Sequence, residues 1–184
     1  MNKFFTSDNH SPTEYKFRYE QQLSFGAMFL ALRIVFGFLE INIGDSYRIT
    51  FSPIPVTLCA YMLGPVFGGI VGCLGDVITL IIHPTGGINF GILLAKTLWG
   101  VLMGVLLHKK PISWLRSIAA NAVCIFICNL CITTYSLCIA YGYPLLAILP
   151  VRLITNVVFL IIYPPATYYL LKLCDRIYRQ MKKQ

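Results

Sequence analysis

The sequence predicts an all-α, polytopic membrane protein: a single bundle of six transmembrane helices with both termini cytoplasmic. Of the 184 residues, 57% are hydrophobic and only 12% are charged, and the mean hydropathy is +0.72. Soluble domains carry about 25% charged residues, so this chain has too few charges to cover a soluble surface. The apolar residues also gather in blocks long enough to cross a bilayer, which takes about 20 residues in a helix.

Polar and turn-forming residues set the ends of the expected helices. The longest apolar block is divided at Gly64-Pro65, because proline cannot continue a helix without losing a backbone hydrogen bond. Loops rich in charged or turn residues separate the other blocks, at residues 44–48, 83–89, 108–111 and 141–144. The six expected helices are 22–43, 53–63, 66–82, 90–107, 118–140 and 149–173.

The charges predict an orientation. The chain carries 15 Lys and Arg residues against 7 Asp and Glu, a formal net charge of +8. Most basic residues lie in the two tails and in the loop after the fourth helix, and Lys and Arg are enriched in cytoplasmic loops. The excess of positive charge is therefore explained by membrane topology and does not indicate a nucleic-acid partner. We expect a cytoplasmic tail at 1–21, a membrane domain at 22–174 and a basic cytoplasmic tail at 175–184.

Two ionisable residues lie near the middle of expected helices. Arg33 is midway along the first helix, and Asp76 is slightly past the middle of the third, so their depths are similar. A charged side chain at the centre of a membrane helix costs about 2.5–3.5 kcal/mol on insertion scales. A structural ion pair between the two helices explains both residues. A proton relay is the alternative, but no further carboxylates accompany Asp76.

Three cations cluster near the expected outer surface, where the topology rule predicts few. Arg48 lies in the first outer loop, while Lys96 and Arg152 lie near the outer ends of the fourth and sixth helices. These side chains can snorkel to lipid headgroups. They can equally line an outward-facing pocket for an anionic solute. The residues alone leave both interpretations open.

Aromatic and turn-forming residues surround these cations. Aromatic faces suit a flat heterocycle, although aromatic residues also form belts at membrane interfaces. The loop 85–89 contains two glycines and can offer backbone amides to a ligand. The candidate ligand-binding residues beside the three cations are Phe51, Thr85, Asn89, Phe90 and Tyr141.

Small residues at four-residue spacing predict close helix contacts. Glycines repeat in this way in the third and fourth expected helices, where we expect packing within the bundle. In the first helix, Ala27 and Ala31 form an A-x-x-x-A motif near the cytoplasmic end, which can instead dock another protein.

The sequence contains no nucleophile–base constellation, phosphate-binding glycine loop or metal-ligand cluster. Cys124, Cys128 and Cys131 are closely spaced, but no His or acidic residue accompanies them. Buried cysteines commonly act as small hydrophobes. We therefore expect no cofactor, no metal and no enzymatic activity. With no ATP site of its own, a bundle of this size needs a partner to drive active uptake.

Five motifs resemble the substrate-binding S components of energy-coupling factor (ECF) vitamin transporters, most closely the folate-specific group. Three follow one another from Arg48 to Gly86: RITFSPIP, MLGPVFGG followed by GCLGD, and PTG. ALRIV in the first helix and LPVRL in the last also resemble that group. The resemblance covers about residues 24–172.

The resemblance implies a six-helix protein of the bacterial cytoplasmic membrane that binds a vitamin at its outer face. It also implies association with a transmembrane coupling subunit and two cytoplasmic ATPases, with Ala27 and Ala31 as the docking face. Folate carries a pterin ring and a glutamate with two carboxylates, which suits the aromatic residues and the three outward cations.

One loop departs from the folate group, because GGINFGILLAK follows PTG in place of the usual aromatic, Pro-Gly-Phe and Thr-Leu-Ser run. Folate is the first expected ligand, and another anionic vitamin such as pantothenate is the alternative. A membrane enzyme using Asp76 or His83, or a structural membrane subunit without a ligand, are the other function classes.

Overall fold

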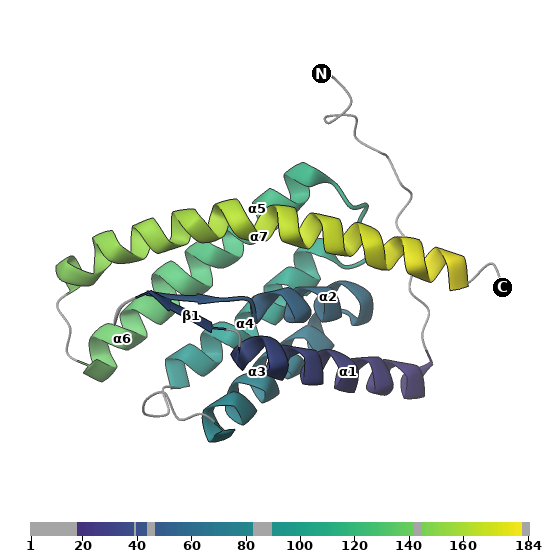
Figure 1. Cartoon of the computed structure of the whole chain (residues 1–184), viewed down its shortest axis with the longest axis horizontal. Helices are drawn as coiled ribbons and strands as arrows, with labels where there is room; N and C mark the ends of the chain where they lie inside the picture. The colour runs from purple at the N-terminus through teal and green to yellow at the C-terminus, as the bar shows by residue number, and fades with distance from the viewer. Residues whose placement is uncertain (1–17, 39, 44–46, 83–89, 142–144, 182–184) are drawn as a thin grey trace, which may run out of the picture.

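A computed structural model describes residues 18–38, 40–43, 47–82, 90–141 and 145–181. Within these ranges the chain forms six helical stretches and one small β-hairpin (Figure 1). The stretches are α1 (Tyr19–Phe38), α2 (Pro53–Leu63), α3 (Pro65–Ile82), α4 (Phe90–Leu107), the run α5 (Trp114–Cys124), η1 (Ile125–Thr133) and α6 (Thr134–Tyr141), and α7 (Leu145–Met181). The predicted six-helix, all-α bundle is confirmed.

Five of the helical stretches are long and apolar enough to cross a membrane. The exception is α2, which at about 1.5 Å per residue extends only about 16 Å. Nine of its residues, from Ile54 to Met62, are buried. A helix that is apolar on all sides is stable only where other elements surround it. Helix α2 therefore forms part of the core of the bundle.

The hairpin corrects the predicted end of the first helix. That helix was expected to continue to Ile43, but β1 (Glu40–Ile43) pairs antiparallel with β2 (Tyr47–Thr50). Strand β1 contains Ile41 and Ile43 and strand β2 contains Tyr47, Ile49 and Thr50, and β-branched and aromatic residues favour strands. The predicted polar loop 44–48 is correspondingly shorter, because Tyr47 and Arg48 belong to β2.

Helices α3 and α4 approach closely because glycines face each other. A Cβ atom added at Gly100 would collide with the backbone of Gly68, and one at Gly72 would lie 2.6 Å from the carbonyl oxygen of Lys96. Helix backbones can approach this closely only where side chains are very small. The expected packing role of these glycines is confirmed.

The fifth and sixth predicted helices are longer than expected. The fifth begins at Trp114 and contains the π-helical segment η1, while α7 continues to Met181 because its charged last turns are made of good helix formers. Prolines interrupt the hydrogen bonding of α7, and a polar seam with α5 forms beside them. Ser117 and Thr167 donate hydrogen bonds to the carbonyl oxygen of Pro164, at 3.2 and 3.0 Å.

Candidate ligand-binding end of the bundle

One end of the bundle gathers the elements that carry the predicted ligand-binding residues. The end of α1, the hairpin, the start of α4, the end of α6 and the start of α7 all lie at the left in Figure 1. The alternating direction of successive helices brings these segments together although they are far apart in the sequence. The opposite end holds the start of α1 and the end of α7.

The two helical cations lie at similar distances from the starts of their own helices. Lys96 follows the first residue of α4 by six positions, and Arg152 follows the first residue of α7 by seven. At about 1.5 Å per residue, both lie about 9–11 Å along their helices. Both side chains are half-buried. The fold thus places at one end of the bundle the starts of the two helices that carry these cations, which are 56 residues apart in sequence.

The remaining predicted ligand residues are placed unequally. Arg48 faces Asn42 across the hairpin ladder, and Phe51, directly after β2, is half-buried. Phe90, the first residue of α4, is 78% exposed. Tyr141 ends α6, with its side chain outside the described part of the chain. Thr85 and Asn89 lie outside the described residues.

An aromatic stack beneath the hairpin was not predicted from the sequence. The Tyr163 ring stacks on Phe159 with centroids 5.0 Å apart and lies edge-on to Trp99 at 6.1 Å. The Tyr163 hydroxyl donates a 2.6 Å hydrogen bond to the carbonyl oxygen of Thr50, the last residue of β2. The four-residue spacing of Phe159 and Tyr163 was a detectable signal. Their contacts with α4 and with the hairpin required the tertiary structure.

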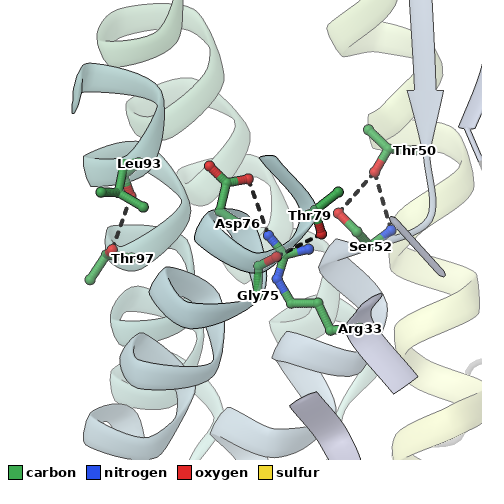
Figure 2. Close-up of polar contacts among 8 residues, drawn as sticks. All are labelled: Arg33, Thr50, Ser52, Gly75, Asp76, Thr79, Leu93 and Thr97. Carbon is green, nitrogen blue, oxygen red and sulfur yellow. Dashed lines mark hydrogen bonds and ion pairs between the residues drawn. The ribbon is translucent and has the colours of Figure 1, made fainter. Parts of the chain in front are cut away.

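Thr50 also connects the hairpin to α2. Its hydroxyl donates to Ser52 Oγ at 2.9 Å and accepts a hydrogen bond from the Ser52 backbone N–H at 3.2 Å (Figure 2). Ser52 is buried and immediately precedes α2. Thr50 is therefore joined to both α2 and α7, which determines where the hairpin meets the bundle.

Arg33 and Asp76 form the ion pair that their depths suggest. Arg33 Nη2 lies 3.4 Å from Asp76 Oδ1, and Arg33 is only 2% exposed (Figure 2). Gly75 makes room for the arginine, because a Cβ atom there would lie 2.5 Å from Arg33 Cδ. The Thr79 hydroxyl donates a 2.6 Å hydrogen bond to the carbonyl oxygen of Gly75 in its own helix. The pair connects α1 to α3.

Ala27 and Ala31 lie on the exposed face of α1. The opposite face of the helix is directed into the bundle, since a Cβ atom at Gly26 would lie 3.5 Å from the Phe67 ring. Larger apolar residues flank the alanines on the exposed face, including Leu23 at 59% and Val35 at 56% exposure. This face is available to lipid or to another membrane helix.

The cysteines form no disulfides, and all seven are free. Cys124 and Cys128 are buried, whereas Cys131 is exposed. Among the described residues, no group of three His, Cys, Asp or Glu side chains could hold a metal ion. Lys96, Arg152, Phe51 and Phe90 are predicted ligand-binding residues whose side chains the structure describes at the hairpin end.

The chain is similar to known proteins over most of its length. A family model described as the substrate-specific component of ECF transporters matches residues 21–171. The folate transporter FolT of Clostridium novyi (strain NT) is 32% identical over 152 residues, covering 82% of this chain and 88% of that protein. A crystal structure of FolT bound with folic acid matches with a TM-score of 0.76 and 30% identity, covering 83% of this chain and 93% of the other.

Proposed function

Since the chain belongs to the family of substrate-specific components of ECF transporters, we propose that it binds folate at the hairpin end of its bundle. The family resemblance predicted from five motifs is confirmed. The observation that carries the choice of folate is the similarity, over most of both chains, to a FolT structure bound with folic acid. This chain is a membrane protein and a transporter subunit.

The residues at the hairpin end support an anionic, aromatic ligand. Folate carries two carboxylates at its glutamate end, and Lys96 and Arg152 supply cations near the starts of α4 and α7. Hydrogen bonds between charged partners are roughly twice as strong as neutral ones. We assign these two residues and Arg48 to the carboxylates, and Phe51, Thr85, Asn89, Phe90 and Tyr141 to the walls of the site.

The proposed orientation places the hairpin end outside the cell and both termini in the cytoplasm. It is supported by the distribution of positive charge, because the two tails and the loop after α4 hold most of the Lys and Arg residues. In this orientation the bacterial cell membrane presents the ligand-binding end to the medium. The A-x-x-x-A face of α1 lies towards the cytoplasmic side.

Uptake then depends on partners. We propose that Ala27 and Ala31 dock a transmembrane coupling subunit, and that two ATPase subunits bound to it hydrolyse ATP. Small residues allow the backbone of a partner helix to approach closely, and both alanines are exposed. This chain contributes ligand capture and docking, with no catalytic step.

A binding measurement on the purified protein in lipid nanodiscs tests the proposal. We expect folate to bind with a submicromolar dissociation constant, about −8 kcal/mol or better, and pantothenate to compete weakly. Mass spectrometry of the small molecule that copurifies should identify a folate. Binding of pantothenate with no binding of folate would overturn the choice of ligand and keep the family assignment.

A further inference from the structure

Three cations and two aromatic rings lie where α4 ends, α5 begins and α7 passes beside α5. Lys110 follows the end of α4, Arg116 lies in the first turn of α5, and Lys172 lies on α7. Helices α5 and α7 are neighbours here (Figure 1), and the Trp114 ring meets the Tyr168 ring edge-on with centroids 5.1 Å apart. The Lys172 ammonium lies 5.8 Å from the centroid of the same Tyr168 ring. We call these five residues the basic cluster.

A small hollow in the surface connects two of the cations. Lys110 and Arg116 both line it, together with Leu171 of α7. Lys110 Nζ donates a 3.1 Å hydrogen bond to the carbonyl oxygen of Val105, and Arg116 Nη1 donates a 3.0 Å hydrogen bond to that of Pro111. These bonds hold both charged groups beside the hollow. Lysine has three N–H donors and arginine has five, so each side chain has further N–H groups with which to bind an anion.

The surface beside the basic cluster is apolar and exposed. Leu115, Tyr169 and Leu173 are each more than half exposed, and each directly follows a member of the cluster on α5 or α7. In a chain that spans the membrane, exposed apolar side chains of this kind contact lipid. Tryptophan and tyrosine are enriched at the membrane–water interface, and lysine and arginine extend from there to headgroups. The basic cluster therefore faces lipid at the level of the headgroups.

The length of α7 agrees with this level. Lys172 follows Arg152 by 20 positions on the helix, which corresponds to about 30 Å at about 1.5 Å per residue. The hydrocarbon core of a bilayer is also about 30 Å thick. The two cations of α7 therefore lie near opposite boundaries of the membrane, Arg152 at the hairpin end and Lys172 in the basic cluster.

The elements that form the basic cluster carry little negative charge. After Asp76, the sequence contains a single acidic residue, Asp175. Asp175 lies one turn beyond Lys172, but it is buried and already has a partner within the protein. Lys109 and Arg176 are exposed nearby in sequence and add further positive charge. Charge complementarity therefore selects an anionic partner.

We propose that the basic cluster binds the phosphodiester headgroup of an anionic phospholipid. Phosphate oxygens form strong, charge-assisted hydrogen bonds with lysine and arginine, and basic pockets between membrane helices bind anionic lipids. A lipid matches both parts of this surface. Its phosphate lies among Lys110, Arg116 and Lys172, and its acyl chains run along the exposed apolar residues. In the orientation proposed above, this lipid belongs to the cytoplasmic leaflet, and its binding is independent of folate.

Native mass spectrometry of the full-length protein tests the proposal. The protein in detergent is titrated with phosphatidylglycerol, and with phosphatidylcholine of the same chain length as the lipid without net charge. The variants are Arg116→Gln and Lys110→Gln. Lys109→Gln is the matched control, because it removes the same charge from an adjacent residue that does not line the hollow.

We expect phosphatidylglycerol to bind at least tenfold more tightly than phosphatidylcholine. Arg116→Gln and Lys110→Gln should each weaken its binding about fivefold, because a cation near an anionic lipid surface contributes about that factor. Lys109→Gln should change it less than twofold. Equal binding of the two lipids, or equal weakening by all three variants, would overturn the proposal.

Two further outcomes would assign the basic cluster to a different anion. Displacement of phosphatidylglycerol by glycerol phosphate at constant ionic strength would show a site for soluble phosphate and overturn the lipid proposal. A coupling subunit that is lost from the purified complex in Arg116→Gln, with no lipid preference in the wild-type protein, would show an acidic protein surface as the partner and overturn it as well.

A measurement on the unaltered chain covers the case in which a variant does not fold. The chain has two tryptophans, of which Trp99 is buried and Trp114 is 37% exposed in the basic cluster. In nanodiscs made mainly of phosphatidylcholine, a small fraction of phosphatidylglycerol brominated near the top of its acyl chains should quench the Trp114 fluorescence. The same fraction of brominated phosphatidylcholine should quench it less. Equal quenching by the two brominated lipids would overturn the proposal.

Discussion

Replacing Asp76 by asparagine should destabilise the bundle strongly, because it leaves the Arg33 guanidinium buried without its carboxylate. At the observed 3.4 Å separation, two unit charges attract by about 5 kcal/mol at an effective dielectric constant of about 20. Arg33 is 2% exposed, so water cannot replace the lost partner. Removing one partner of a buried pair typically costs about 3–5 kcal/mol. We expect a loss of this size in the free energy of unfolding for Asp76→Asn.

The double variant Arg33→Met/Asp76→Leu provides the control. It removes both charges and replaces them with apolar side chains, which is often nearly neutral for buried ion pairs. We expect it to be more stable than Asp76→Asn by about 2 kcal/mol or more.

The cysteines make the assay direct. Cys59, Cys124 and Cys128 are free and at most 1% exposed. Because Cys131 is exposed and reacts in the folded state, unfolding is measured as the additional reaction of a thiol-reactive fluorescent dye when these three side chains become accessible in detergent. Equal stability of Asp76→Asn and the wild-type protein would refute the ion-pair reasoning. So would a double variant less stable than Asp76→Asn.

Four further changes have expected outcomes. Gly100→Ala places a methyl group against the backbone of α3. The overpacking should lower the free energy of unfolding by about 1–3 kcal/mol in the same dye assay. An unchanged unfolding midpoint would contradict the close approach of α3 and α4. Tyr163→Phe removes the 2.6 Å hydrogen bond to Thr50 and should lower the free energy of unfolding by about 1–3 kcal/mol. The backbone amide of Thr50 should then exchange its hydrogen faster. Unaltered exchange would contradict the role of Tyr163 in holding the hairpin. Ala27→Trp should abolish copurification with the coupling subunit while folate binding persists, and a complex that survives would exclude this face as the docking surface. Arg152→Glu should weaken folate by at least 2 kcal/mol if its side chain pairs with a buried carboxylate, and calorimetry showing wild-type affinity would remove Arg152 from the site.

Helix positions were predictable because two strong local signals agree. Apolar blocks of membrane-spanning length and the turn residues between them placed α3 and α4 almost to the residue. The first helix was extended too far, because Ile41 and Ile43 follow the apolar residues of α1. Strand β1 could be identified only from the structure, in which it pairs with β2. The π-helical segment η1 has no such signal in its sequence.

The site was only partly predictable. Three cations could be found from the sequence: Arg48, Lys96 and Arg152. Charged residues are rare within apolar blocks, and the positive-inside rule predicts few Lys and Arg residues on the outer side of the membrane. The anchoring of the hairpin to α7 gave no comparable signal, since a tyrosine in a membrane helix is ordinary. It became visible in the structure, where the Tyr163 hydroxyl donates a hydrogen bond to the carbonyl oxygen of Thr50.

By itself, the sequence determined that this is a six-helix membrane protein, where its helices lie, and which family it resembles. Composition and periodicity act locally along the chain, so they can be read without coordinates. Only the tertiary structure decided which residues meet. It confirmed the Arg33–Asp76 pair that the sequence suggested, and it joined Tyr163 to Thr50 across 113 positions of sequence, which the sequence did not suggest. It also brought Lys96 and Arg152 to one end of the bundle. Such contacts depend on how helices pack, and packing is settled by the shapes of all the side chains together.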